Sequence, residues 1–243
     1  MAQNEARKQL MTSLQDAFRS GDYSDFTVIC GPDSYPVHKL ILCTRSDFFA
    51  KAVKFGKEAK EGKIDLVEDD PTIVKLMLHY FYWGDYDASS HGTAEPDPTT
   101  SVPSGVVRMG RRDVCGHNYY YEDCPYCPET RYFIEEDCEA LVIHAKMYAI
   151  AEKYNIIGLK QLAKERFEPE CEYFWNHSEF PIAANIVYDS TPENDKGLRD
   201  IVVKTIVSHM ELLQKPEIEA VMTDYSGLLF GVLKEKAQMY GWK

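Results

Sequence analysis

One change of composition most constrains how this chain can fold. Residues 87–105 are rich in Ser, Thr, Pro and Gly, a composition typical of linkers, and residues 111–130 gather Cys, His and Tyr. Apolar residues recur with helical periodicity on both sides, up to Gly84 and again over 139–153. We therefore predict that residues 87–137 are an insertion between two helices of one core.

Charge and length narrow the class of protein. Lys and Arg number 27 against 39 Asp and Glu among 243 residues, a formal net charge of −12. Proteins that bind nucleic acid or anionic membranes neutralise phosphates with Lys and Arg, so we expect neither partner. No apolar run approaches the roughly 18 residues of a membrane helix, and the N-terminus lacks the apolar stretch of a signal peptide. Seven cysteines without a secretory signal favour a reduced compartment, cytoplasmic or nuclear.

The first part of the chain mixes strands and short helices. Residues 5–19 predict an amphipathic helix, because Leu10, Leu14 and Phe18 share one face beside Met11. The later elements that we expect are a strand at 26–30, a strand at 35–37, two short helices within 40–53 broken near Ser46, a solvated loop at 54–63, a strand at 64–67, and a helix that Asp70 and Pro71 begin and Gly84 ends.

The last part of the chain is helical in short pieces. Residues 139–153 predict a helix that is apolar nearly all round and therefore buried. Further helices are expected at 159–167, closed by Pro169, at 178–188 and at 197–209. A last helix follows, capped by Asp224, with its inward residues at Leu228, Leu229, Val232, Leu233 and Tyr240.

Several short motifs occur in a fixed order on both sides of the insertion. They are Ser24-Asp25 before the first strand, Val37-His38-Lys39 before an apolar helix, Arg45-Ser46-x-Phe-Phe49, the aromatic segment 80–86 with Gly-Asp-Tyr, and Ala149-x-Glu-Lys-Tyr154. In this order they resemble the BTB/POZ domain in the form common in fungal proteins. The resemblance implies an α+β fold, a small sheet packed on short helices, followed by a helical region. The predicted divisions are 1–20, 21–168 and 169–243.

The resemblance also implies a two-fold dimer. Many members of the family exchange or pack their N-terminal helix across the dimer, and Leu10, Met11, Leu14 and Phe18 would lie in that interface. Asp25 and Lys39 match a buried acid–base pair near the same seam. The alternative remains that the apolar face of residues 5–19 covers the core of its own chain.

Some family members are adaptors that bind a cullin for ubiquitination. Their loop after the third helix carries an apolar residue two positions before a glutamate. The matching loop here contains Phe55, Glu58 and Glu61, but Gly56 and Ala59 stand at that spacing, which departs from the family pattern. We expect a non-catalytic interaction protein that binds itself and other proteins, with a cullin among the candidates. The alternative is a transcriptional regulator acting through partners.

The insertion carries one candidate metal site. Cys124 and Cys127 have the Cys-x-x-Cys spacing that lets two thiolates reach one zinc ion, and Cys115 and His117 complete a set of four ligands. A closed set of three sulfurs and one imidazole suits a structural zinc that helps a polar segment to fold. His91 and Cys138 are fallback ligands. A loop with free cysteines or a redox-sensitive pair remains an alternative.

Motifs of common enzymes are missing from the sequence. There is no phosphate-binding Gly-x-x-x-x-Gly-Lys loop, no Gly-x-Gly-x-x-Gly and no His-Glu-x-x-His. His38 and His144 are each expected to be capping or core residues. A zinc-dependent enzyme would need an open coordination position, which four protein ligands do not leave. We therefore expect no catalytic residues and no small-molecule substrate.

Overall fold

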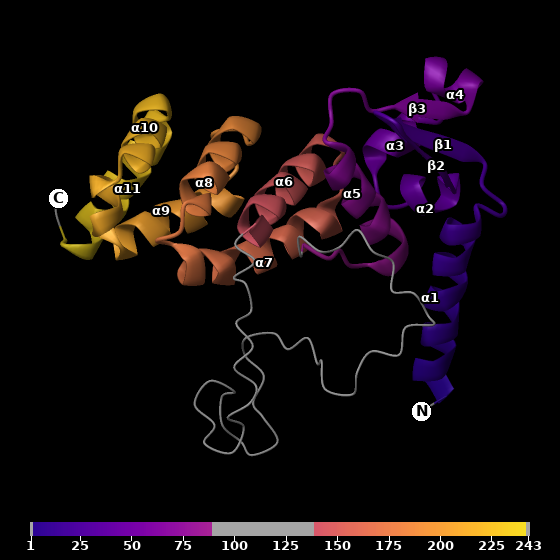
Figure 1. Cartoon of the computed structure of the whole chain (residues 1–243), viewed down its shortest axis with the longest axis horizontal. Coiled ribbons are helices and arrows are strands. Elements are labelled where there is room, and N and C mark those ends of the chain that lie inside the picture. Colours follow the sequence, from indigo (N-terminus) through magenta and orange to yellow (C-terminus); the bar gives the residue numbers. More distant parts are fainter. Residues whose placement is uncertain (1, 89–138, 242–243) are drawn as a thin grey trace. The chain divides into compact units, whose positions relative to one another are not determined.

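A three-stranded sheet lies at the centre of the N-terminal part of the protein (Figure 1). The structure is a computed structural model, and it describes residues 2–88 and 139–241. The strands β1 (Phe26–Cys30), β2 (Asp33–Val37) and β3 (Lys63–Asp65) lie in the order β2-β1-β3. The central β1 pairs antiparallel with β2 and parallel with β3. Its alternate residues Phe26, Val28 and Cys30 are buried, as expected for a strand with one face on the core.

Five helices accompany the sheet. They are α1 (Ala2–Ser20), α2 (Lys39–Cys43), α3 (Asp47–Ala52), α4 (Lys57–Glu61) and α5 (Pro71–Trp83). Local sequence explains where two of them begin. The Ser46 hydroxyl accepts from the Phe49 N–H at the start of α3, and the Asp70 carboxylate accepts from the Thr72 N–H at the start of α5. Both starts agree with the sequence prediction.

The C-terminal part contains only helices. They are α6 (Glu139–Lys153), α7 (Ile157–Phe174), α8 (Glu179–Ser190), α9 (Gly197–Ser208), the short 3₁₀ helix η2 (Met210–Gln214), α10 (Pro216–Asp224) and α11 (Ser226–Met239). Helix α6 packs against α5 of the sheet-containing part and against α7 and α8, so it links the two parts (Figure 1). The α+β class with a helical C-terminal region is confirmed.

Helix α7 differs from its prediction. The sequence placed its end at Pro169, but the helix continues to Phe174. Proline removes one backbone donor and costs helix stability. The buried side chains of Phe167, Cys171 and Phe174 continue the inward face past the proline, and their burial outweighs that cost.

Helix α4 was predicted as part of a loop. Gly56 precedes it and Gly62 ends it, with φ angles of 85° and 66°, so the two glycines bound a short run of strong helix formers.

Helix α11 faces its neighbours differently from the prediction. Leu228 and Val232 are buried as expected, whereas Leu229, Leu233 and Tyr240 are 43%, 54% and 65% exposed. Gly231 explains the orientation. A Cβ atom there would lie 2.8 Å from a methyl group of Val203 on α9, so the glycine face is the one that approaches α9.

The helix start predicted at Asp224 was wrong, since Asp224 ends α10, and α10 itself was not predicted.

The described helices include none that is long and apolar enough to cross a membrane. The divisions at 20, 21–168 and 169–243, with residues 87–137 as an insertion, stay predictions, because most of the insertion lies outside the described residues.

Candidate interaction surfaces

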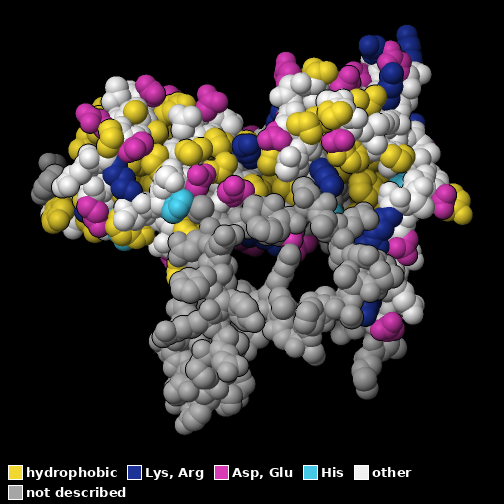
Figure 2. All heavy atoms as spheres, viewed as in Figure 1, with side chains coloured by type: hydrophobic (Ala, Val, Ile, Leu, Met, Phe, Trp, Pro, Cys, Tyr) yellow, Lys and Arg dark blue, Asp and Glu magenta, His cyan; other side chains and the backbone are white. Residues whose placement is uncertain are grey.

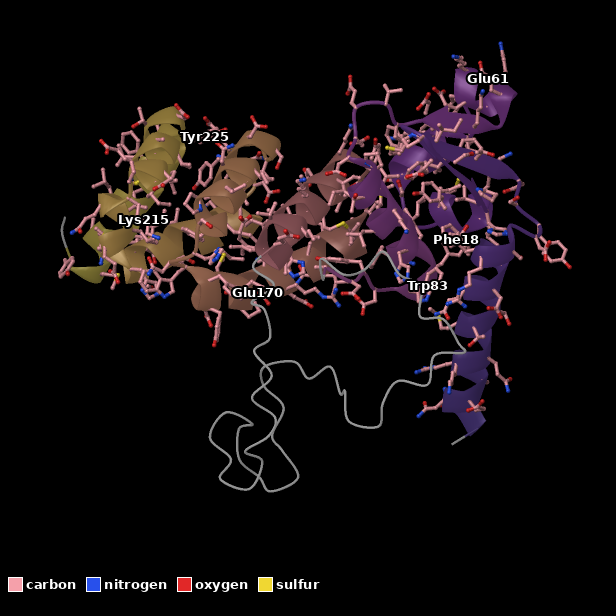
Figure 3. The ribbon with its side chains drawn as sticks, viewed as in Figure 1. Phe18, Glu61, Trp83, Glu170, Lys215 and Tyr225 are labelled. Carbon is pink, nitrogen blue, oxygen red and sulfur yellow. The ribbon has the colours of Figure 1, made fainter. Side chains whose placement is uncertain are left out.

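Helix α1 is anchored to the core at its C-terminal end. The Phe18 ring lies 4.5 Å from the Tyr82 ring and meets Trp83 edge-on at 5.8 Å (centroid distances; Figure 3). The Arg19 guanidinium lies 5.4 Å from the centre of the Trp83 ring, within the range of a cation–π contact. Phe18 therefore covers the core of its own chain, as the single-chain alternative expected.

The preceding turns of α1 are far less covered. Leu10 is 61% exposed, and Met11 and Leu14 are half-buried. In Figure 1 the N-terminal end of the helix points away from the sheet. The described residues leave this apolar helix face uncovered, and such a face is typical of a surface that a partner covers.

Asp25 and Lys39 contact each other in an unexpected way. The Asp25 carboxylate accepts from the backbone N–H of Lys39 at 2.8 Å, at the first residue of α2. The Lys39 ammonium instead lies 5.9 Å from the centre of the Phe26 ring. Asp25 is exposed, so the single chain forms no buried side-chain pair here. The carboxylate satisfies a backbone donor that the start of α2 leaves without a helical partner.

Two exposed residues that the sequence analysis did not select lie next to this contact in the chain. Leu40 follows Lys39 and is 73% exposed, and Tyr23 precedes Asp25 by two positions and is 93% exposed with a φ of 62°. A bulky residue with positive φ is uncommon and costs conformational energy. An aromatic residue directly before the Ser24-Asp25 motif was the sequence signal that could have found Tyr23.

His38 fastens this surface to the core. Its two ring nitrogens lie 2.8 Å from the Tyr82 hydroxyl and 2.8 Å from the Asp22 carbonyl oxygen, and its backbone N–H donates to the Tyr82 hydroxyl at 2.9 Å. Burial raises the pKa of Tyr82 to about 12, so the hydroxyl keeps its proton. His38 thus holds the turn before β1 against α5, which is a structural role.

The loop before α4 presents one apolar side chain. Phe55 is 69% exposed, Glu58 is half-buried and Glu61 is exposed. Glu61 pairs with Lys57 at 3.6 Å within α4, which lies beside β3 (Figure 3). The three predicted loop residues therefore lie close in the chain, with Phe55 as the apolar contact that the loop offers.

The predicted metal ligands Cys115, His117, Cys124 and Cys127 lie outside the described residues, as do His91 and Cys138. Within the part of the chain that the structure describes, no three His, Cys, Asp or Glu residues are grouped to hold a metal ion.

His144 is a core residue, as predicted. It is 5% exposed, and its Nδ1 atom lies 2.7 Å from the Tyr86 hydroxyl. Burial, with a smaller contribution from the charge of Arg166, lowers the pKa of His144 to about 3. The imidazole is therefore neutral at neutral pH and joins α6 to the segment after α5.

Charged side chains of both signs are interspersed over the described part of the face in Figure 2, with hydrophobic side chains between them. Such a face suits contact with proteins better than contact with a phosphate backbone.

Comparison with known proteins gives a match to a family model. The model, described as BTB/POZ domain, matches residues 14–96. BTB/POZ domain-containing protein 1 of Schizosaccharomyces pombe is 30% identical over 86 residues, covering 30% of this chain and 6% of that protein. Human Kelch-like protein 40 is 32% identical over 73 residues, covering 30% of this chain and 12% of that protein.

A third similarity extends further along the chain. BTB/POZ and MATH domain-containing protein 4 of Arabidopsis thaliana is 21% identical over 196 residues, covering 79% of this chain and 39% of that protein. The chain thus spans well under half the length of each of these curated relatives.

Proposed function

Because this chain carries a BTB/POZ domain, matched over residues 14–96, we propose that it acts as a self-associating adaptor. The domain family is one of non-catalytic interaction modules, and the similarity to a Kelch-like protein supports an adaptor role. The observation that carries self-association is the surface formed by α1, Tyr23 and Leu40. We call it the N-terminal surface.

The N-terminal surface suits a second copy of the chain. Leu10, Tyr23 and Leu40 are the three most exposed of its apolar side chains, at 61%, 93% and 73%. A two-fold contact uses the same patch on both copies, so the total apolar area that it buries is twice that of one patch. Asp25 and Lys39, which join β1 to α2 at this surface, would lie near its seam.

Size-exclusion chromatography with light scattering tests this proposal. At tens of micromolar the full chain should have about twice the mass of the 27.9 kDa monomer. The double variant Leu10→Glu/Leu40→Glu should be monomeric, because a charge in the centre of an apolar interface stays unpaired. Leu229→Glu on α11 is the matched control and should stay dimeric. A monomeric wild-type chain would refute self-association.

The loop with Phe55, Glu58 and Glu61 is the proposed site for a cullin. Support comes from the exposed Phe55, three positions before Glu58, although the spacing differs from the family pattern described above. Affinity purification followed by mass spectrometry, comparing wild type with Phe55→Ala, tests it. Loss of a cullin in the variant would support the site, and recovery of transcription factors without a cullin would favour the regulatory alternative.

We also propose a structural zinc ion held by Cys115, His117, Cys124 and Cys127. Their residue types and spacing support it. Elemental analysis of reduced protein should find close to one zinc per chain, and Cys124→Ser should lose it. A metal-free reduced wild type would overturn the proposal.

A further inference from the structure

An open pocket lies where the turn between α6 and α7 meets α5. It is lined by the α2–α3 turn at residues 44–47, by Tyr80 of α5 and by residues 155–158 at the start of α7. None of the surfaces discussed above includes it. On its Tyr80 side the pocket is cationic and hydrogen-bond donating, as three groups show, whereas Asp47 lines the α3 side.

The first group is the hydroxyl of Tyr80. Tyr80 is only 7% exposed, yet its hydroxyl makes no hydrogen bond to any residue that the structure describes. The hydroxyl points at the first turn of α7, since a Cβ atom on Gly158 would lie 2.4 Å from it. The hydroxyl oxygen is not among the fully buried atoms that lack a partner, so it reaches the open pocket and can donate to a ligand there.

The second group is the Arg45 guanidinium. Its Nη1 atom donates to the Phe81 carbonyl at 2.6 Å and more weakly to the Tyr80 carbonyl at 3.3 Å. The guanidinium also lies 4.5 Å from the centre of the Tyr80 ring. No carboxylate among the described residues forms an ion pair with it, and its N–H groups beyond those two bonds can donate to a ligand.

The third group is the start of α7. The residue before the helix is Ile156, whose apolar side chain makes no cap, so the N–H groups of residues 157–159 have no acceptor within the described part of the chain. These N–H groups and the dipole of this 18-residue helix favour a negative charge.

The protein contains a second, occupied version of the same arrangement. At the start of α9 the hydroxyl of buried Tyr148 also faces a glycine, Gly197, and Lys160 lies 5.0 Å from the centre of the Tyr148 ring. There the carboxylate of Asp195 fills the space. It accepts from the Tyr148 hydroxyl at 2.8 Å and the Gly197 N–H at 2.8 Å, and it pairs with Lys160 at 2.7 Å.

We propose that the pocket around Tyr80 binds a carboxylate from a partner protein, an Asp or Glu side chain that is followed by an apolar residue. The carboxylate takes the position that Asp195 occupies beside Tyr148, with Tyr80, Arg45 and the N–H groups of α7 as donors. The apolar neighbour contacts Ile157, which lines the same pocket and is 76% exposed.

Asp47 limits how the ligand can enter. It lines the pocket from the α3 side, and its carboxylate accepts from the Asn155 side chain at 3.2 Å. A ligand carboxylate therefore binds at the Tyr80 and Gly158 side, where the donors are, and away from Asp47. This proposal rests on the proposed function as a protein-binding module and names the chemistry of one partner segment.

Amide spectra of the ¹⁵N-labelled full chain test the pocket. The probes are the capped dipeptide acetyl-Glu-Leu-amide, its neutral match acetyl-Gln-Leu-amide, and inorganic phosphate. The Glu peptide should shift the amide signals of Ile157 and Gly158 in a saturable way, and the Gln peptide should not. Tyr80→Phe should weaken the Glu peptide about tenfold, because it removes a hydrogen bond to a charged group. Tyr173→Phe, further along α7, is the matched control.

Each other outcome overturns the proposal. Equal shifts with both peptides would mean a purely apolar contact, and shifts with phosphate alone would mean a site for small anions. If the Glu peptide bound the Tyr80→Phe variant as tightly as the wild type, the Tyr80 hydroxyl would not be a ligand-binding group. Because the mass measurement reports on the N-terminal surface alone, a failed titration with an intact dimer leaves the proposed function standing.

Discussion

Two groups of three side chains, each an aspartate, a lysine and a tyrosine, hold α6 in place, and they differ in how far their lysine is buried. The sheet clamp consists of Asp69, Lys153 and Tyr154, and fastens the end of α6 to the segment between β3 and α5. The tail clamp consists of Asp195, Lys160 and Tyr148, and fastens α6 and α7 to the loop before α9. In each, one carboxylate accepts from a tyrosine hydroxyl and a lysine ammonium.

The tail clamp is the more enclosed of the two. The Lys160 side chain is 29% exposed, against 44% for Lys153, and Asp195 also accepts from the N–H that begins α9. Burial alone would raise the pKa of Asp195, but its contacts with Lys160, Gly197 and Tyr148 hold that pKa below the ordinary value. The two clamps share their residue types but differ in their donors and in the burial of their lysine, so we expect the tail clamp to stabilise the fold more.

The largest expected effect comes from breaking the tail clamp. Asp195→Asn should lower the free energy of unfolding by about 2 to 3 kcal/mol, because the partly buried Lys160 ammonium loses one of its two carboxylate partners and keeps only that of Glu152. Urea unfolding at pH 7 measures it. A loss no greater than that of Asp69→Asn would contradict the ranking of the two clamps.

A pH series separates the tail clamp from buried His144, which titrates at higher pH than Asp195 in the unfolded chain. The folded pKa of His144, about 3, lies below its ordinary 6.5, so the unfolded chain binds the proton first and stability falls as pH drops below 6.5. Between pH 7 and pH 5 this loss is about 2 kcal/mol. The depressed pKa of Asp195 acts only lower, below its ordinary 3.8. His144→Gln should flatten the upper part of the curve, and an unchanged slope would exclude His144 as the cause.

The sheet clamp should respond less. Asp69→Asn keeps an acceptor for the Tyr154 hydroxyl and removes the negative charge that pairs with the half-exposed Lys153. The free energy of unfolding should therefore fall by about 1 kcal/mol. Thermal and urea unfolding of the same sample measure it. A fall as large as that of Asp195→Asn would mean that burial does not separate the clamps.

The smallest effect serves as the baseline. Lys57→Ala removes the exposed pair with Glu61 in α4 and should change the free energy of unfolding by less than about 0.5 kcal/mol. Urea unfolding beside the clamp variants measures it. A larger change would indicate that α4 contributes to the core.

Local patterns predicted much of the fold. The β-branched run of β1 and the Asp70-Pro71 start of α5 are signals within a few residues, and both appear where expected. Glycines with positive φ around α4 and the buried face beyond Pro169 depend on tertiary packing, so they were not predicted.

The candidate sites divide in the same way. The apolar stripe of α1 can be read from its spacing, but which of its turns is covered depends on Phe18 meeting Tyr82, 64 positions later in the chain. The Tyr80 pocket needs Arg45, Tyr80 and Gly158 together, which no motif joins. Contacts at such separation exist only once the core has formed.

Pro169 gives α7 a place where its two halves can part. The carbonyl of Glu165 receives no N–H from position 169, so the hydrogen-bond ladder is interrupted there. The first half carries Gly158 and Lys160, which serve the pocket and the tail clamp, and the second half carries Cys171 and Phe174 in the helical core. Amide protons on the two sides of Pro169 should therefore exchange with solvent as separate cooperative units, and a strain applied to one end of α7 would be released in the middle of the helix.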